Sequence, residues 1–363
     1  MKKKCFTLFF LLISAFIFAG QNLHIFKHNG LYGYFNDDMK VVIDAIYPEA
    51  SPFYDGEALV RLDEEKYGIL NENGERQKLP DYFDDKNVDL IYRLSSHCYR
   101  LDTFEKDPND FSNYPRRYNC IYLYSTKNNQ YYRAGRINFS YMSLDLDYYF
   151  SAGCDLGYGY FDDDLNLNPA NQEDFWLKLY PMRDGAALAV DNKHNHHLID
   201  SNYNIILEEI GDSGSEFHDG LMPMVYNEKI GYVNTKGEFV IETSFYAEVY
   251  DFFPPTINYD FSEGVAVPQV KKGIWRSYDT KGKILMQDRE LFFCSKQQEG
   301  LIRFQKEKKG KFGFMDKYGY VEIPCNFDKA EDFVYGYALV EIDGKDALLK
   351  PDGSIVYSEE LVR

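Results

Sequence analysis

Three short stretches of the chain contain residue types that could do chemistry, and the first has the form of a nucleophilic turn. The tetrapeptide Gly211-Asp212-Ser213-Gly214 would present one serine hydroxyl on a tight bend. Nucleophilic catalysis by serine also needs a base and an orienting carboxylate in the correct geometry. No histidine segment of a suitable type precedes this turn at a suitable distance, so we expect no catalytic serine there.

The second stretch imitates the oxygen ligands of a calcium loop. It runs from Asp162 to Asn168, and Glu173 stands in the twelfth position. A calcium loop needs glycine in its sixth position for a sharp turn, and it needs six or more converging oxygens. Leu167 occupies the sixth position, and no helical pattern flanks the stretch. We therefore expect a polar hairpin turn between two repeats, with calcium binding as the alternative.

The third stretch is the densest group of histidines, His194, His196 and His197. On a strand, successive side chains point to opposite faces, so His194 and His196 would converge while His197 points away. Two imidazoles are fewer than the three or four ligands of a zinc site. We expect an exposed turn here, with a transition-metal site as the alternative. For the chain as a whole we expect no catalytic residue, no metal ligand and no cofactor site.

The elements that would have to position such residues are copies of one short module. Each copy has an aromatic or aliphatic residue, then Gly, two apolar residues, Asp or Asn, and a turn that ends in Gly. The clearest copies are Tyr67–Gly74, Ile230–Gly237 and Phe312–Gly319. Two short runs of β-branched and aromatic residues around a polar turn with Gly predict a β-hairpin.

A second periodic segment accompanies each hairpin. It contains a turn with Gly, and a further short strand begins directly after this Gly. The clearest copies begin at a Phe and are Phe53–Ala58, Phe261–Ala266 and Phe333–Ala338. Weaker copies contain Asp184-Gly185, Asp219-Gly220 and Glu299-Gly300. One hairpin and one strand make a three-stranded unit. No stretch after residue 20 has a sustained helical period, so we expect helices to be few and short.

These units repeat along nearly the whole chain, mostly at intervals of 34 to 38 residues. Their equivalent positions are Gly33, Gly68, Tyr122, Gly159, His197, Gly231, Arg276, Gly313 and Ala347. Such a period is typical of folds in which each unit buries its apolar face against its neighbours. We predict an all-β tandem array of about nine units, either an open, solenoid-like array or a ring. Residues 76–155 hold degenerate units or an insertion, and the last unit, Asp346 to Val356, has the form of a terminal cap.

The aromatic–glycine pair of each unit resembles the repeat of the WG-repeat family, which is named for a Trp-Gly pair. The residues that precede the glycine include Tyr32, Tyr67, Tyr158 and Phe312. Trp275-Arg276 keeps the Trp and loses the Gly. The resemblance covers roughly residues 24–363, and it implies a repeat protein that acts as a binding or scaffolding module.

The N-terminus has the pattern of a secretory signal peptide. Three lysines precede an apolar run from Phe6 to Phe18, and the small residues Ala19 and Gly20 follow. The run is shorter than the roughly 20 apolar residues that span a bilayer. We expect residues 1–20 to be removed and 21–363 to form the repeat domain. The mature chain would then have no membrane span and would lie in the periplasm, on the cell surface or outside the cell.

The charge of the chain limits the class of its partner. With 40 basic and 58 acidic side chains, the formal net charge is -18. Removal of the three signal lysines makes it 37 minus 58, or -21. A strongly acidic protein is repelled by nucleic acid and by anionic membranes, so we expect neither as a partner. The charge also favours solubility, and it could attract a basic partner or divalent cations.

Five cysteines follow the N-terminal segment, and their number is odd. They are Cys98, Cys120, Cys154, Cys294 and Cys325. None forms a Cys-x-x-Cys pair, so neither a disulfide framework nor a zinc ribbon is indicated. We expect buried thiols, with Cys98 to Cys120 as the one plausible bridge.

The central segment is rich in tyrosines that the repeat pattern does not require. Tyrosine presents an apolar ring and a hydroxyl together, which suits the binding of peptides or sugars. The candidate binding residues are Tyr118, Tyr122, Tyr124, Tyr131, Tyr132, Tyr148 and Tyr149. The alternative is that these rings pack the irregular units.

The sequence thus predicts an exported, non-catalytic repeat protein that binds or scaffolds another protein at the cell envelope or outside. A carbohydrate or cell-wall ligand is the second possibility. A glycosidase with dispersed carboxylates is the third, because acid pairs that are distant in sequence leave no local pattern.

Overall fold

The described part of the chain is almost entirely β-structure. The structure is a computed structural model, and it describes residues 22–362 except 64–65, 84–87, 107–116, 139–149, 155–156, 163, 170–175, 209, 211–212, 215, 227–228 and 247–258. Within these residues lie strands β1 to β32, the 3-10 helix η1 (Asp81–Phe83) and the short helix α1 (Ser358–Leu361). The prediction of an all-β fold with few, short helices is confirmed.

The strands form antiparallel sheets that follow one another along the chain. The first sheet contains β1 (Leu23–His28), β2 (Leu31–Asn36) and β3 (Val41–Tyr47), and it is followed by the pair β4 (Glu57–Asp63) and β5 (Lys66–Asn71). The largest sheet contains β6 (Val88–Arg93), β7 (Cys98–Lys106), β8 (Arg117–Ser125), β9 (Gln130–Asn138), β10 (Phe150–Cys154), β11 (Gly157–Phe161) and β12 (Leu167–Pro169).

Five sheets of four strands complete the chain. The first two are β13 (Trp176–Leu179), β14 (Ala186–Asp191), β15 (His196–Asp200) and β16 (Ile205–Leu207), then β17 (Ser213–Gly214), β18 (Leu221–Tyr226), β19 (Lys229–Asn234) and β20 (Phe239–Tyr246). The third is β21 (Val265–Ala266), β22 (Gln269–Lys271), β23 (Ile274–Asp279) and β24 (Ile284–Glu290). The last two are β25 (Phe293–Gln298), β26 (Leu301–Gln305), β27 (Phe312–Met315) and β28 (Val321–Phe327), then β29 (Lys329–Ala330), β30 (Ala338–Ile342), β31 (Lys345–Leu349) and β32 (Ile355–Tyr357).

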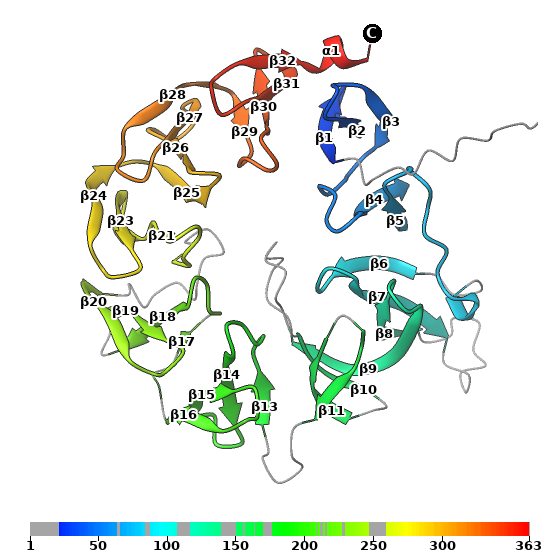
Figure 1. Cartoon of the computed structure of the whole chain (residues 1–363), viewed down its shortest axis with the longest axis vertical. Coiled ribbons are helices and arrows are strands. Elements are labelled where there is room, and N and C mark those ends of the chain that lie inside the picture. The colour runs from blue at the N-terminus through cyan, green and yellow to red at the C-terminus, as the bar shows by residue number, and fades with distance from the viewer. Residues whose placement is uncertain are drawn as a thin grey trace, which may run out of the picture.

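The sheets lie side by side around a ring, with the first sheet beside the last (Figure 1). Seven of the described sheets have three or more strands, and β4–β5 is an abbreviated sheet in the same ring. The fold is therefore a seven-bladed β-propeller. The open, solenoid-like alternative is excluded. The prediction of about nine three-stranded units is wrong, because the blades are fewer and most of them have four strands.

Nine equivalent positions give fewer blades because strand pairing merges two units. Tyr122 lies in β8 and Gly159 lies in β11, and β9 pairs with β10 between them, so both positions belong to one sheet. This sheet contains much of the degenerate segment 76–155. The β4–β5 pair gains only a single bridge on each side and stays short. Pairing between strands of different units depends on which strands lie side by side in the folded protein. The repeat pattern does not contain this information.

The Asp or Asn of each module holds the turn that follows it. Asp316 Oδ1 accepts hydrogen bonds from the backbone N–H groups of Tyr318 (2.9 Å) and Tyr320 (2.8 Å). Gly319, in the same turn, adopts φ +85°, a conformation that glycine tolerates best. Equivalent bonds form at Asn36, Asn71, Asn234 and Asp279. The polar residue of the module is therefore there to stabilise a tight hairpin turn.

The glycine of the aromatic–glycine pair is required by a close approach of two strands. The register between β27 and β28 shifts around Gly313, which brings the β28 backbone over this glycine. A Cβ at Gly313 would lie 2.7 Å from the Ile323 carbonyl oxygen and 2.8 Å from the Cys325 nitrogen. Ala347, at the equivalent position of the last blade, pairs with β32 without a register shift, so a methyl group is tolerated there.

We expect Gly313→Ala to destabilise the protein by about 1–3 kcal/mol, because the new methyl group must displace β28 backbone. Ala347→Gly is the matched control, and it should cost at most about 1 kcal/mol through added backbone freedom. Chemical denaturation of both variants measures the difference. A Gly313→Ala variant as stable as the wild type would show that the two strands separate without cost.

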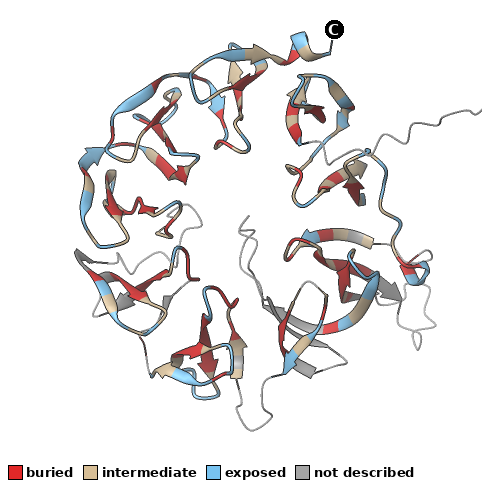
Figure 2. Ribbon diagram, in the orientation of Figure 1, coloured by how far each residue is buried: buried red, intermediate tan, exposed pale blue. Residues whose placement is uncertain are grey.

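Neighbouring blades also interlock through their outer turns. A Cβ at Gly319 would lie 2.8 Å from the Met286 sulfur on β24, and one at Gly282 would lie 3.3 Å from Ile241 on β20. Between blades, buried side chains form shared clusters, as where Phe314 and Leu349 join one core. Figure 2 shows buried segments on the inner and middle strands and exposed segments on outermost strands. Each blade therefore buries its apolar residues against its neighbours, as the repeat pattern predicts.

The ring closes through side-chain packing between its first and last blades. Phe26 and Phe35 of the first sheet share a fully buried cluster with Leu348 of β31. Met39 stands at a turn position that is glycine in most other blades, and the Tyr337 hydroxyl lies 3.5 Å from its sulfur. The sheets β1–β3 and β29–β32 remain separate. Closure thus rests on an apolar seam between two sheets that share no strand.

Candidate functional site

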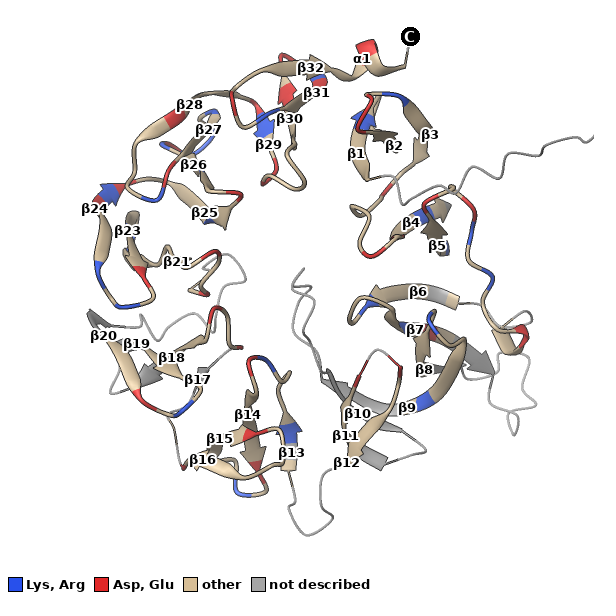
Figure 3. Ribbon diagram, in the orientation of Figure 1, with Lys and Arg blue, Asp and Glu red and all other residues tan. Residues whose placement is uncertain are grey.

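Turns that face the middle of the ring form a repeated polar surface (Figure 1). Each turn lies within the second periodic segment of its repeat, directly before a strand. Both central residues of the turn have positive φ, for example Asp184 at 50° and Gly185 at 79°. We name as the acidic inner turns the exposed residues Asp55, Asp184, Asp219, Glu263 and Glu299. Figure 3 shows acidic segments at the inner ends of these blades. Tyr335 occupies the same position in the last blade.

Hydrogen bonds tie consecutive inner turns to one another. Four of the five carboxylates accept a bond from the backbone N–H of the glycine in the next turn. These bonds run from Gly220 to Asp184 (2.9 Å), Gly264 to Asp219 (2.8 Å), Gly300 to Glu263 (2.8 Å) and Gly336 to Glu299 (2.9 Å). The contacts hold the carboxylates at fixed places while the residues stay exposed. The result is a preorganised series of negative charges along the inner side of the ring.

Four ionisable side chains gather directly beside two of these turns. Arg183 Nε lies 3.1 Å from Glu216 Oε2, Arg183 Nη1 lies 3.4 Å from His218 Nδ1, and His218 Nε2 lies 3.8 Å from Asp260 Oδ2. Arg183, Glu216 and His218 are buried, and Asp260 is partly exposed. We call these four residues the buried charge cluster. Three neighbouring blades contribute to it.

Burial raises the pKa of the Glu216 carboxyl to about 7, and the negative charge of Asp260 adds to this effect. The positive charge of Arg183 and the nearby His218 act in the opposite direction. The ion contact of Glu216 with Arg183 is the main compensation for the burial of this carboxyl. A carboxyl that titrates near neutrality could serve as a general acid or base. Glu216 is only 4% exposed, however, so no substrate reaches it in this conformation.

The tyrosines predicted to form a binding surface differ in their burial. Tyr122 and Tyr124 are buried in the core of the large sheet, which is the packing role that the sequence left as the alternative. Tyr131 and Tyr132 on β9 are partly exposed, and the Tyr131 ring stacks on Tyr82 with centroids 4.8 Å apart. The side chain of Tyr118, and Tyr148 and Tyr149 entirely, lie outside the described residues. A binding role for the remaining tyrosines stays a prediction.

The three stretches singled out for chemistry do not come together. Asp162 begins the turn between β11 and β12, and its carboxylate accepts bonds from the N–H groups of Asp164 (3.0 Å) and Asn166 (2.8 Å). The predicted hairpin turn is confirmed, but it joins two strands of one sheet and does not lie between two repeats. Asp163 and Glu173 lie outside the described residues. Gly211 and Asp212 of the serine tetrapeptide also lie outside them, while Ser213-Gly214 forms β17.

The histidine group is split between a turn and a strand. His194 is exposed in the turn before β15, as predicted. The expectation of exposure is wrong for His197, which is buried in β15 and lies 3.2 Å from Asp191. Successive strand residues point to opposite faces, and both faces of β15 are covered. Leu198 packs in one core cluster, while His197 lies on the other face, beside Trp176 of a second cluster. Among the described residues, no three His, Cys, Asp or Glu side chains are placed to hold a metal ion.

Cysteine pairing is absent where it can be assessed. Cys98, Cys120 and Cys294 are buried free thiols, and Cys325 is a partly buried one. The plausible bridge from Cys98 to Cys120 is therefore not formed. These two residues lie at different levels of β7 and β8, where Cys98 is opposite Ser125 and Cys120 is opposite Thr103. The side chain of Cys154 lies outside the described residues.

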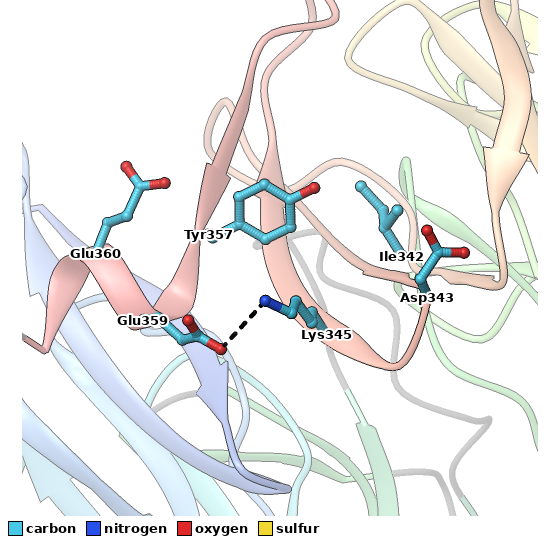
Figure 4. A pocket seen from close by; sticks show the side chains of 6 residues that line it. All are labelled: Ile342, Asp343, Lys345, Tyr357, Glu359 and Glu360. Atoms are coloured by element: carbon cyan, nitrogen blue, oxygen red, sulfur yellow. Dashed lines mark ion pairs between the residues drawn. The ribbon is translucent and has the colours of Figure 1, made fainter.

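A cavity of about 710 Å³ lies in the last blade, beside α1 (Figure 4). Its lining comprises Ile342, Asp343, Lys345, Tyr357, Glu359 and Glu360. Lys345 Nζ lies 3.8 Å from Glu359 Oε1 across it. Four of these six residues are charged and exposed, and none of the six belongs to the acidic inner turns. It therefore does not extend the candidate site.

Sequence reasoning missed the buried charge cluster, although its residues occupy equivalent positions. Glu216 and Asp260 each precede the phenylalanine of their module, and Arg183 and His218 each precede the acidic residue of an inner turn. An alignment of the modules would have shown charged residues at matching places in adjacent units. It would not have shown that they are buried together.

The closed ring of blades and its polar inner turns define the chain as a β-propeller built from repeats. The family model described as WG containing repeat matches residues 32–67 and 312–345. The WG-type repeat is therefore present at these two places, and the resemblance seen in the aromatic–glycine pairs is confirmed there. The comparison with curated proteins found no match.

Two solved structures illustrate the similarity of this chain to other proteins. A structure titled as the eukaryotic initiation factor aligns with a TM-score of 0.55 at 10% identity, over 93% of this chain and 95% of that one. This likeness agrees with the fold, and at such an identity it concerns the fold alone. BamB from Moraxella catarrhalis aligns more weakly, with a TM-score of 0.39 at 9% identity, over 85% and 95% of the two chains. No helix in the described part of the chain is long and apolar enough to cross a membrane.

We expect Arg183→Met to destabilise the protein by about 3–5 kcal/mol, because it leaves a buried carboxylate without its cation. Arg61→Met is the matched control. Arg61 pairs with Glu49 at 2.6 Å on the surface of β4, where removal of an ion pair should cost at most about 1 kcal/mol. Urea denaturation at pH 8 compares the two variants. Equal losses would show that the Arg183 contact is no more important than a surface pair.

Proposed function

We propose that this protein is an exported, non-catalytic propeller that binds a partner protein at the cell envelope or outside, through its acidic inner turns. The partner would present a lysine- or arginine-rich surface or segment. The observation that carries the proposal is the presence of an exposed Asp or Glu at the same position of five inner turns, four of them fixed by a hydrogen bond to the next blade.

Fixed carboxylates favour binding because little conformational freedom is lost when a partner docks. Their shared sign would steer a basic partner toward the ring and reject acidic ones. The net charge of -18 acts in the same direction. A partner held by such contacts would bind more weakly as salt is added, since mobile ions screen exposed charges.

A binding role is favoured over catalysis by the state of the titratable groups. The one carboxyl near the inner turns with a pKa close to neutrality, Glu216, is enclosed by protein. Repeats that supply a regular surface are commonly used for recognition. Export rests on the sequence alone, on the lysines and apolar run of residues 1–20.

The binding proposal predicts a specific loss when the inner-turn charges are removed. In the inner-turn variant, Asp55, Asp184 and Asp219 become Asn, and Glu263 and Glu299 become Gln. Amides keep an oxygen that can accept the bond from the next glycine, so the turns should persist while the charge is lost. Capture of partners from an envelope extract, followed by titration of the captured partner, should show at least tenfold weaker binding.

The matched control removes five exposed carboxylates that lie away from the inner turns. In this outer variant Asp38 becomes Asn, and Glu75, Glu290, Glu322 and Glu360 become Gln. Both variants change the net charge by the same amount, so a general charge effect would weaken both equally. Equal weakening, or unchanged binding by the inner-turn variant, would contradict the proposal.

The export proposal predicts a shortened mature chain. Expressed in a secreting host, the protein should begin at Gly20 or Gln21, because cleavage is expected after Ala19 or Gly20. Mass spectrometry of the extracytoplasmic fraction measures this terminus. Recovery of the full chain from Met1, in the cytoplasm alone, would refute export.

A further inference from the structure

The buried charge cluster joins three successive blades at one point. Arg183 comes from the segment between β13 and β14, Glu216 and His218 come from the segment between β17 and β18, and Asp260 comes from the segment before β21. Glu216 contacts the arginine of the preceding blade, and His218 faces both Arg183 and the aspartate of the following blade. A change of charge at Glu216 therefore alters the electrostatic interactions at two blade interfaces.

The cluster contains one permanent cation and two carboxyl groups. With Glu216 protonated, the permanent cation Arg183 faces a neutral carboxyl in the buried part of the cluster. Ionisation of Glu216 places a charge on a carboxyl that is only 4% exposed. A buried charge is costly, and the protein can lower this cost by letting water reach the cluster. Asp260 is already partly exposed, whereas Glu216 and Arg183 are enclosed by neighbouring blades, so a looser contact between these blades would give water fuller access to them.

We propose that the buried charge cluster is a pH-responsive joint, which holds three adjacent blades together when Glu216 is protonated and loosens them when it ionises. Glu216 is the switching group and Arg183, His218 and Asp260 are the groups that face it. The inference does not depend on the proposed binding function. It concerns how firmly this part of the ring is closed.

All groups that face Glu216 contribute to the direction of the response. Arg183 lies on the preceding blade, His218 on its own segment and Asp260 on the following one, which also lies near the buried Tyr232. The pKa of Glu216 is raised in the folded state, so the folded protein binds a proton that the opened state releases. This contribution to stability is fully present below the ordinary carboxyl pKa of about 4.3 and is lost as the pH rises through about 7.

Hydrogen exchange measured by mass spectrometry tests this joint in the intact protein. The probes are amides of β14 and β18, whose exchange is corrected for the intrinsic effect of pH. We expect the opening constant of these strands to rise at least tenfold between pH 5 and pH 7, since the two pKa values differ by more than two units. In Glu216→Gln, which stays neutral, the rise should be less than twofold.

The control uses an equivalent contact elsewhere in the ring. Asp332 precedes Phe333 as Glu216 precedes Phe217, and Asp332 Oδ1 lies 2.9 Å from Arg303 Nε, with partial exposure of both residues. Asp332→Asn should leave the pH response of β14 and β18 as in the wild type. The strand β26, which carries Arg303, gives an internal reference within one molecule if Glu216→Gln does not fold.

The inference would be overturned by a wild-type response of β14 and β18 no larger than that of β26. It would equally be overturned by a Glu216→Gln variant that keeps the full wild-type response. A response confined to β14 and β18 and abolished by Glu216→Gln would establish the joint.

Discussion

Each blade of this propeller can bury its apolar side chains only against the blades beside it. This constraint makes the two interfaces of every blade, rather than any single sheet, the source of stability. It also requires the chain to close, because an open end would leave an apolar face in water. Phe26, Phe35 and Leu348 meet this requirement at the seam. Met39 contacts Tyr337 of the last blade there, from a turn position that is glycine in most other blades.

Polar groups determine how the blades are aligned. The carboxylates of the inner turns bond to the backbone of the next turn, so the same residues that present negative charge also hold neighbouring blades in register. The buried charge cluster adds a second polar contact, but only among three blades. Under the proposed function, stability and recognition would be combined on the inner side of the ring, where a change of charge would affect both.

Much of the local structure could be predicted from the sequence because short-range chemistry decides it. The Asp or Asn of each module accepts hydrogen bonds from the backbone N–H groups two and four residues later in its turn, as at Asp316. The number of blades could not be predicted, because β9 and β10 pair across a degenerate segment. The burial of individual tyrosines could not be predicted for a similar reason. Tyr122 and Tyr124 are of a residue type that is common in binding surfaces, but their burial depends on Phe83 and other distant residues.

By itself the sequence determined the module, its hairpins, its turn residues, the all-β class and the acidic character of the chain. These follow from periodicity and from bonds between residues close in the chain. Tertiary structure alone decided that the array closes into a ring, that two units share a sheet, and that Arg183, Glu216, His218 and Asp260 meet. The physical reason is that both closure and burial depend on contacts between residues far apart in sequence, whose free energy no local pattern records.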